Sequence, residues 1–207
     1  MKKILALLVV SLFMVSGVLM AQPATTTTTT PQRAYTAIGL HMPFMYFFSA
    51  EEGSMEMGGI VFKAPISKTF GVQFDINKLV VPIKEYVYAN TTYEGFGEEE
   101  YNNFQLALLY FMPFNKYIQL KIGAEYYNYV NGYIAINQTA TSCGDMRTHC
   151  ANCQDDMFGV FGGLNLDVPL YERILIMTSL NYHWVFGDHP SMETGYVDFT
   201  LGIGYQI

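Results

Sequence analysis

Three cysteines and a histidine lie close together in the sequence and are the side chains best suited to bind a metal ion. Cys143, Cys150 and Cys153 fall in the segment TSCGDMRTHCANCQDD, and His149 precedes the second of them. Three thiolates and an imidazole could fill a tetrahedral zinc site, although one CxxC without a second spaced pair is a weak zinc signature. In an oxidising compartment the plainer interpretation is one loop disulfide with one cysteine left over, and the pairing is open.

A serine and a histidine on one predicted strand are the candidates for hydrolytic chemistry. Ser179 and His183 stand four residues apart, on the same face of that strand. At about 3.3 Å per residue the two side chains are roughly 13 Å apart, which is too far for a nucleophile and its base to share a proton. We therefore assign no catalytic residue, no metal site and no cofactor, and expect a protein that is not an enzyme.

A further set of polar residues shares one face of several predicted strands. The set comprises Asp75, Lys121, Glu125, Asp167, Asn181, His183 and Asp198. Opposite charges that are removed from water together must pair to offset the cost of desolvation. Lys121 is therefore expected to pair with a carboxylate, and the candidates are Glu125, Asp75 and Asp198.

The segments that position these residues are short and alternate between apolar and polar positions. In 197–207 every second residue, from Val197 to Ile207, is apolar, and the residues between them are polar or Gly. A period of two is typical of a β-strand. The alternation recurs in 70–77, 117–126, 158–167 and 174–184, and less cleanly in 35–47, 56–64 and 102–112. The sequence predicts eight strands.

Short and long connections alternate between the predicted strands. The short ones are three proline-containing turns, Ala64–Lys68, Met112–Lys116 and Val168–Glu172. Proline ends a β-ladder because it lacks an N–H group, so a tight hairpin follows each strand. The long ones are 48–55, 83–101, 129–156 and 186–194. This order places both ends of the predicted barrel on the side of the short turns.

Such an arrangement favours a membrane barrel over a soluble sandwich. Outer-membrane barrels have short turns at one rim, longer loops at the other, and strands of about 9–11 residues. Aromatic residues at the strand ends predict two belts at the membrane interfaces. The belt at the short turns would contain Tyr35, Phe70, Tyr110, Phe114, Tyr117, Tyr171 and Tyr205, and the other Tyr46, Phe47, Phe104, Tyr126, Phe158, Tyr182, Trp184 and Tyr196.

The first residues have the features of a secretory signal peptide. Lys2 and Lys3 precede an apolar run that ends at Ala21, which predicts cleavage after residue 21; an uncleaved anchor helix is the alternative. Residues 22–33 form a Thr-rich linker, and 34–207 form one domain. Removal of residues 1–21 takes away two basic and no acidic residues, which leaves a formal charge of −9. This acidic balance argues against nucleic acid as a partner.

With its signal peptide, eight alternating strands and closing segment GYVDFTLGIGYQI, the chain resembles the small outer-membrane β-barrel proteins of the OmpA and OmpX transmembrane-domain type. The resemblance covers 34–207 and rests on architecture. It implies an all-β, eight-stranded, antiparallel up-and-down transmembrane barrel in the bacterial outer membrane. It also implies contact with outer-membrane lipid, insertion by the β-barrel assembly machinery and a monomeric state. The chain departs from the group in its last residue, Ile207, where an aromatic residue is usual, which weakens the assembly signal.

The expected function follows from the width of such a barrel. Eight strands enclose a space that side chains fill. The sequence therefore favours a closed lumen, with envelope structure, adhesion or protection carried by the extracellular loops, chiefly 83–101 and 129–156, whose ligand it does not identify. A narrow pore, a lipid A-modifying enzyme and a soluble lipocalin-like barrel are the alternatives.

Overall fold

The computed structural model describes residues 34–48, 52–55, 58–88, 91–136, 139–142, 156–186, 192 and 195–207. The described residues belong to one compact unit, Arg33–Ile207. The predicted signal peptide and linker lie outside the described residues, as do Cys143, Cys150 and Cys153. No helix formed by the described residues is long and apolar enough to cross a membrane.

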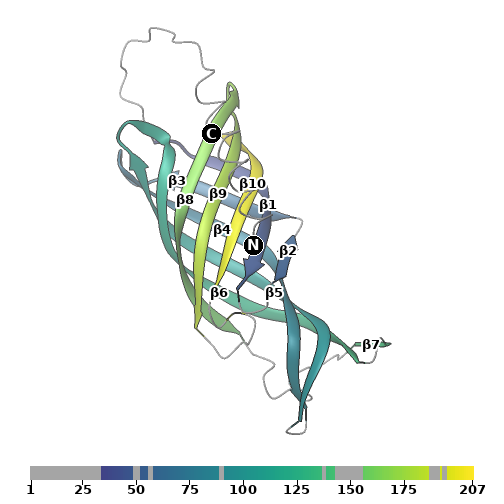
Figure 1. The fold of residues 1–207 in the computed structure, drawn as a ribbon. Coiled ribbons are helices and arrows are strands. Elements are labelled where there is room, and N and C mark those ends of the chain that lie inside the picture. The colour runs from purple at the N-terminus through teal and green to yellow at the C-terminus, as the bar shows by residue number, and fades with distance from the viewer. Residues whose placement is uncertain are drawn as a thin grey trace. The chain divides into compact units, whose positions relative to one another are not determined.

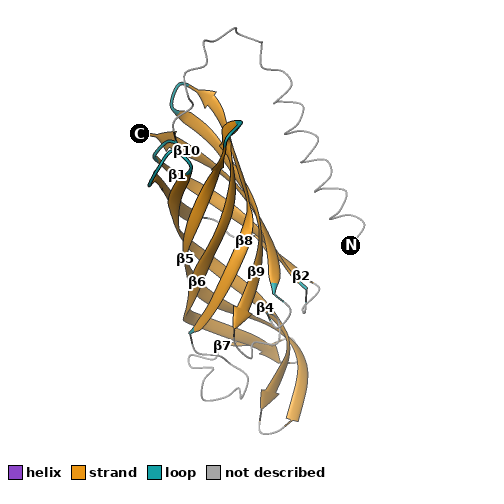
Figure 2. Ribbon diagram, turned by 90° about the vertical axis from the view of Figure 1, so that its left-hand side faces the viewer, coloured by secondary structure: helices purple, strands orange, loops and turns teal. Residues whose placement is uncertain are grey.

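Among the described residues, ten strands form one antiparallel sheet, and eight of them close into a barrel (Figures 1 and 2). The barrel strands are β1 (Ala37–Phe47), β3 (Gly59–Pro65), β4 (Phe70–Tyr88), β5 (Thr91–Met112), β6 (Asn115–Ile136), β8 (Met157–Tyr171), β9 (Ile174–Phe186) and β10 (Tyr196–Gln206). β10 pairs with β1 along its whole length, which closes the barrel. The short strands β2 (Glu52–Met55) and β7 (Thr139–Ser142) pair with β1 and β6. The predicted eight-stranded up-and-down barrel is confirmed.

The outer face of the barrel is apolar and exposed. The large apolar side chains on it include Ile38, Leu40, Met42, Ile60, Phe62, Phe74, Ile76, Leu106, Leu108, Leu120, Ile122, Val160, Leu164, Leu180, Leu201 and Ile203. Soluble proteins rarely expose contiguous apolar patches of more than a few hundred Å². A closed backbone ladder with an apolar exterior is the structure that a lipid bilayer requires. A soluble lipocalin-like barrel, which would face water on its outside, does not fit this distribution.

Aromatic side chains border the apolar face at both ends. Phe70, Tyr171 and Tyr205 are exposed near the short turns, and Phe158 and Trp184 are exposed near the other end. Aromatic side chains, especially those of Trp and Tyr, are enriched at the interfaces between a bilayer and water. The barrel therefore has an aromatic border at each expected membrane interface.

Four residues assigned to these belts face the lumen instead; one of them, Tyr117, is partly buried and packs against Tyr35. Tyr35, Phe47 and Tyr196 are buried, with exposed fractions of 4%, 0% and 2%. Odd-numbered residues of β1 and even-numbered residues of the first half of β10 point inward, so the parity of each strand decides the direction of its aromatic side chains. Their position near a strand end was insufficient to place them.

The third short turn lies later in the chain than predicted. β8 continues through Pro169 to Tyr171, and the turn is formed by Glu172 and Arg173. The pairing of β8 with β9 shifts register between Pro169 and Tyr171. A sheet can accommodate a proline at a bulge of this kind, because the ladder does not require an N–H donor at that position. The proline therefore marks an irregularity in the strand and not its end.

The long connections depart most from the prediction. Segment 83–101 was expected to be a loop, but β4 and β5 stay paired from Phe70↔Tyr110 to Tyr88↔Thr91. β6 likewise continues to Ile136 and then pairs with β7. We call the outer part of this extension, residues 82–88, 91–98, 133–136 and 139–142, the arm; it reaches beyond the ends of β9 and β10 (Figure 1). Outside the bilayer neither face of a strand needs to be apolar. The strands therefore stay hydrogen-bonded there without the alternation of apolar and polar residues from which a strand is predicted.

The orientation of the outer face can be tested at Ile122, which lies on β6 and is 66% exposed. An arginine on the lipid-facing side near the bilayer centre costs about 2–4 kcal/mol. Ile122→Arg should therefore lower the free energy of unfolding in phospholipid vesicles by that amount, as followed by urea titration of the fluorescence of Trp184, the single tryptophan. Ile66→Arg is the control, because Ile66 is also 66% exposed but lies in a turn. Equal losses in the two variants would contradict the lipid-facing assignment.

Candidate functional site

The side chains inside the barrel form three layers along its axis. An apolar group near the long connections, the loop-end cluster, consists of Met45, Phe47, Leu79, Val81, Tyr101, Tyr127, Met157, Met192 and Tyr196. A second apolar group near the short turns, the turn-end cluster, consists of Tyr35, Ala37, Val61, Leu109, Phe111, Leu175 and Met177. Between them lies the polar layer, which comprises His41, Lys63, Gln73, Asp75, Asn77, Asn103, Gln105, Gln119, Lys121, Glu125, Asn165, Asp167, Ser179, Asn181, His183, Asp198 and Thr200.

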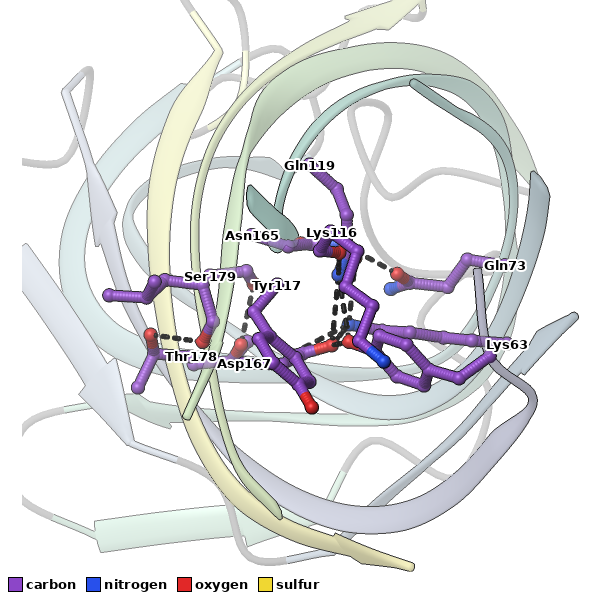
Figure 3. Close-up of polar contacts among 12 residues, drawn as sticks. Lys63, Gln73, Lys116, Tyr117, Gln119, Asn165, Asp167, Thr178 and Ser179 are labelled. Carbon is purple, nitrogen blue, oxygen red and sulfur yellow. Dashed lines mark hydrogen bonds and ion pairs between the residues drawn. The ribbon is translucent and has the colours of Figure 1, made fainter. Parts of the chain in front are cut away.

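Asp167 on β8 is the centre of the polar layer nearest the short turns. Its carboxylate accepts hydrogen bonds from Lys63 Nζ at 2.8 and 2.9 Å, from Gln119 Nε2 at 3.1 Å and from the hydroxyl of Tyr35. Lys63 is 3% exposed and Asp167 is fully buried, so the ion pair is shielded from water. Figure 3 shows Lys63, Gln119 and Asp167 meeting inside the ring of strands. This cluster joins β3, β6 and β8 to the residues that precede β1.

A chain of amides extends this cluster across the lumen. Asn165 Nδ2 donates to Gln73 Oε1 at 2.8 Å and to Gln119 Oε1 at 3.3 Å (Figure 3). Gln73 Nε2 in turn donates to Asp75 Oδ2 at 2.6 Å. Because an amide both donates and accepts, side chains of β4, β6 and β8 bond directly to one another, while the buried oxygens Asp75 Oδ1 and Asn165 Oδ1 accept no hydrogen bond from the described residues. The barrel wall is thereby cross-linked from the inside.

His183 is the centre of the other half of the polar layer. Its Nδ1 lies 2.9 Å from Glu125 Oε2, and its Nε2 lies 2.7 Å from Asp198 Oδ2. The imidazole is stacked between Tyr196, at 4.2 Å between ring centroids, and Phe161, at 5.3 Å. An imidazole donates to two carboxylates only when both of its nitrogens carry a proton. The ring therefore bridges two buried carboxylates from β6 and β10.

Amide side chains support both of these carboxylates. Asn181 Nδ2 donates to Asp198 Oδ1 at 2.6 Å, and Asn103 Nδ2 donates to Glu125 Oε2 at 3.2 Å. Buried polar groups are costly unless they are hydrogen-bonded, so these amides reduce the cost of holding the carboxylates inside. Glu125 thus has partners on β5 and β9, whereas both partners of Asp198 lie on β9.

The six side chains named from the sequence as a lumen network fall into both halves of the polar layer. They are Asp75, Lys121, Glu125, Asp167, His183 and Asp198, and none is more than 5% exposed. The structure brings Glu125, His183 and Asp198 into direct contact. Asp167 and Asp75 belong to the half nearer the short turns.

Lys121 is placed differently from the expectation. Its Nζ lies 5.2 Å from the centroid of the Phe161 ring, a cation–π arrangement. Among the described residues it forms no ion pair, so the direct pairing predicted with Glu125, Asp75 or Asp198 is not made.

Lys63, which was not among the predicted lumen residues, forms a buried ion pair with Asp167. Residues 56–64 alternate weakly, which concealed the parity of this strand. In β3, Ile60 and Phe62 point outward while Val61 and Lys63 point inward. Ile60 and Phe62 are large apolar residues two positions apart, and this spacing could have revealed the parity of the strand. If both side chains face lipid, Lys63, the next residue, must face the lumen.

The hydroxyl and imidazole considered for catalysis are held by other partners. Ser179 Oγ lies 2.5 Å from the hydroxyl of Thr200, and both nitrogens of His183 lie against carboxylates. Among the described residues, no group of three or more His, Cys, Asp or Glu side chains is arranged to hold a metal ion. The cysteine cluster lies outside the described residues.

Little free space remains in the polar layer. A cavity of about 10 Å³ lies between side chains that include His41, Lys63, Gln73, Asn165 and Thr200. A volume of this size holds about one water molecule. The interior is therefore filled by side chains, as the geometry of eight strands requires.

Solved structures with a similar fold are outer-membrane proteins. The outer-membrane protein OprG of Pseudomonas aeruginosa matches with a TM-score of 0.54 and 14% identity, over 85% of this chain and 97% of OprG. The chain has the fold of the outer-membrane β-barrels. Ail, the attachment invasion locus protein of Yersinia pestis, matches with a TM-score of 0.48 and 13% identity, over 85% of this chain and 100% of Ail. No protein-family model and no curated protein matches this outer-membrane β-barrel chain.

The Lys63–Asp167 ion pair gives a test of the polar layer. Asp167→Ala leaves the buried lysine without a charged partner, its remaining hydrogen bond being to Gln119 Oε1, and should lower the free energy of unfolding by about 3–5 kcal/mol. The double variant Lys63→Met/Asp167→Leu should recover most of this loss, because it removes both charges. The control is Lys78→Met, which breaks a partly exposed pair with Glu100 (3.0 Å) and should cost less than about 1 kcal/mol. A double variant as unstable as Asp167→Ala would exclude an unpaired charge as the cause.

The His183 bridge gives a second test, with a variant that keeps the aromatic stack. His183→Phe leaves the carboxylates of Glu125 and Asp198 without their shared donor, and should cost about 3–5 kcal/mol of unfolding free energy in urea titrations. Adding Glu125→Gln and Asp198→Asn removes both charges and should restore more than half of the loss. A triple variant that is no more stable than His183→Phe would show that the loss does not come from the uncompensated charges of Glu125 and Asp198.

Proposed function

We propose that the protein is a closed, monomeric barrel of the bacterial outer membrane, inserted by the β-barrel assembly machinery, whose extracellular elements serve envelope structure, adhesion or protection. The observation that carries the proposal is the three-layer interior. A polar layer sealed between two apolar clusters supports a rigid anchor and not a conduit. The function then belongs to the parts of the chain that leave the membrane.

Both mouths of the barrel favour closure to ions. An ion that enters from the long-connection side meets the loop-end cluster, to which the 186–194 connection contributes Met192, 1% exposed. From the other side it meets Phe111, Leu175 and the remainder of the turn-end cluster. The side chains of the two clusters are mainly apolar and do not form the rings of charged or carbonyl groups that replace the hydration shell of an ion in a channel. The buried carboxylate of Glu99 at the loop end accepts a hydrogen bond from the hydroxyl of Tyr101 at 2.6 Å. A conducting pore would require both the loop-end cluster and the turn-end cluster to open.

The arm is the part of the chain best placed to meet a partner. Its strands stay hydrogen-bonded beyond the last pairing of β6 with β8, at Tyr127↔Met157. The sequence from Glu85 to Glu98 is acidic and rich in tyrosine, and aromatic residues are enriched at protein interfaces. A paired sheet presents such residues at lower entropic cost than a free loop does, because its backbone is already ordered. This supports adhesion or shielding at the cell surface.

Catalysis finds no support in the polar layer, and we propose that the protein is not an enzyme. A nucleophile needs an adjacent base, but Ser179 pairs with Thr200 while His183 serves two carboxylates. Ser179 and His183 are both enclosed in the lumen, so a lipid head group would have to displace one of the apolar clusters to reach either side chain. Unaltered lipid A on overexpression is the expected result.

Planar bilayer recordings test the proposal. Purified protein that migrates as the folded, heat-modifiable form on gels should insert without unitary conductance steps, because both apolar clusters block ion passage. Lys121→Ala is expected to behave in the same way, since it changes the polar layer and leaves the clusters intact. Reproducible steps in the wild type that change in Lys121→Ala would establish the narrow pore and overturn the proposal.

A further inference from the structure

The lipid-facing surface has one feature that the closed-barrel function does not explain. A groove of about 450 Å³ opens outward near the seam between β1 and β10. Its side-chain walls are Ile38, Leu40, Ile60, Ile174, Ile203 and Tyr205. The volume lies within the range of roughly 300–1,000 Å³ that is typical of ligand sites.

The floor of the groove is formed by two paired glycines. Gly39 on β1 lies opposite Gly204 on β10, and both line the groove. On the inner side the sulfur of Met177 packs against them: a Cβ would lie 2.8 Å from this sulfur at Gly39 and 2.2 Å from it at Gly204. The glycines therefore let the turn-end cluster pack directly behind the floor. This keeps the groove separate from the polar layer.

A cation stands at the turn end of the groove. Arg173 directly precedes Ile174, and its guanidinium donates to the hydroxyl of Tyr205 at 3.4 Å. The backbone amide of Gln206 donates to the carbonyl of Arg173 at 2.7 Å, which ties the turn to the last strand. An exposed arginine at the edge of an apolar surface, beside an interfacial tyrosine, is suited to bind a phosphate.

We propose that this groove binds one glycerophospholipid of the periplasmic leaflet, with an acyl chain along the apolar walls and its phosphate at Arg173. The groove opens on the face that contacts hydrocarbon, so an acyl chain is the ligand that it meets. The short turns are the periplasmic end of such barrels, which places the guanidinium at the level of the head groups of that leaflet. The proposal needs only the barrel in its membrane and does not depend on whether the lumen conducts.

Native mass spectrometry of the full chain in detergent tests the site, with dioleoylphosphatidylglycerol as the probe. One molecule should bind at least about tenfold more tightly than any further molecule, since a charge-assisted hydrogen bond is worth about 1.5–3 kcal/mol. Arg173→Gln should weaken this first binding roughly tenfold and leave the binding of dioleoylglycerol, which lacks the phosphate, unchanged. Leu40→Trp and Ile203→Trp fill the groove and should weaken the binding of both lipids.

Leu164→Trp is the matched control, because it enlarges an outward-facing side chain, 43% exposed, on β8, a strand that contributes no residue to the groove. It should bind phosphatidylglycerol as the wild type does. Heat-modifiable migration on gels identifies the folded fraction of each variant, and two groove-filling variants allow for one that does not fold. Equal binding by the groove-filling variants and Leu164→Trp would overturn the proposal. A dimer that Leu40→Trp dissociates would also overturn it, by assigning the groove to a second copy of the chain.

Discussion

The pairing of β1 with β10 is the constraint from which the rest of the structure follows. In a bilayer each unpaired backbone N–H or C=O group costs several kcal/mol, so the first and last strands must join. The ladder from Ala37↔Gln206 to Phe47↔Tyr196 makes this closure. Closing eight strands leaves an interior that side chains must fill. Every inward-facing residue therefore needs a partner from another wall of the barrel, as Lys63 and Asp167 illustrate.

The order of the three layers has its own energetic reason. Hydrogen bonds and ion pairs strengthen in a low dielectric, but an unpaired polar group costs more there. The two apolar clusters exclude water from the layer between them, which increases both effects. The bridge from Glu125 through His183 to Asp198 is therefore tightly bound and intolerant of the loss of one member. A lumen cross-linked in this way supports the proposal that the function belongs to the parts of the chain outside the membrane.

The sequence predicted the transmembrane strands because lipid on one side imposes a period of two, as in 117–126. It failed where that condition ends. In 83–101 the sequence does not alternate, yet β4 and β5 stay paired there, because a backbone ladder outside the bilayer does not require an apolar face. Parity explains the errors inside the barrel: Tyr35 was assigned to a belt by its place near a strand end, yet its hydroxyl reaches Asp167. Lumen partners such as this pair, 132 residues apart, depend on the stagger between strands, which no local pattern reports.

The barrel separates its two outward-facing features in space. In the closed order of strands, the arm extends from β4, β5 and β6, whereas the groove crosses the seam of β1 and β10 on the other side of the ring. The arm also leaves the loop end, while Arg173 stands at the turn end. A partner bound to the arm would therefore not displace a lipid from the groove. The two sites are joined by the hydrogen-bonded wall through β3 and β4 and by the side chains of the lumen, and no residue is common to both. The two surfaces are thus expected to act independently.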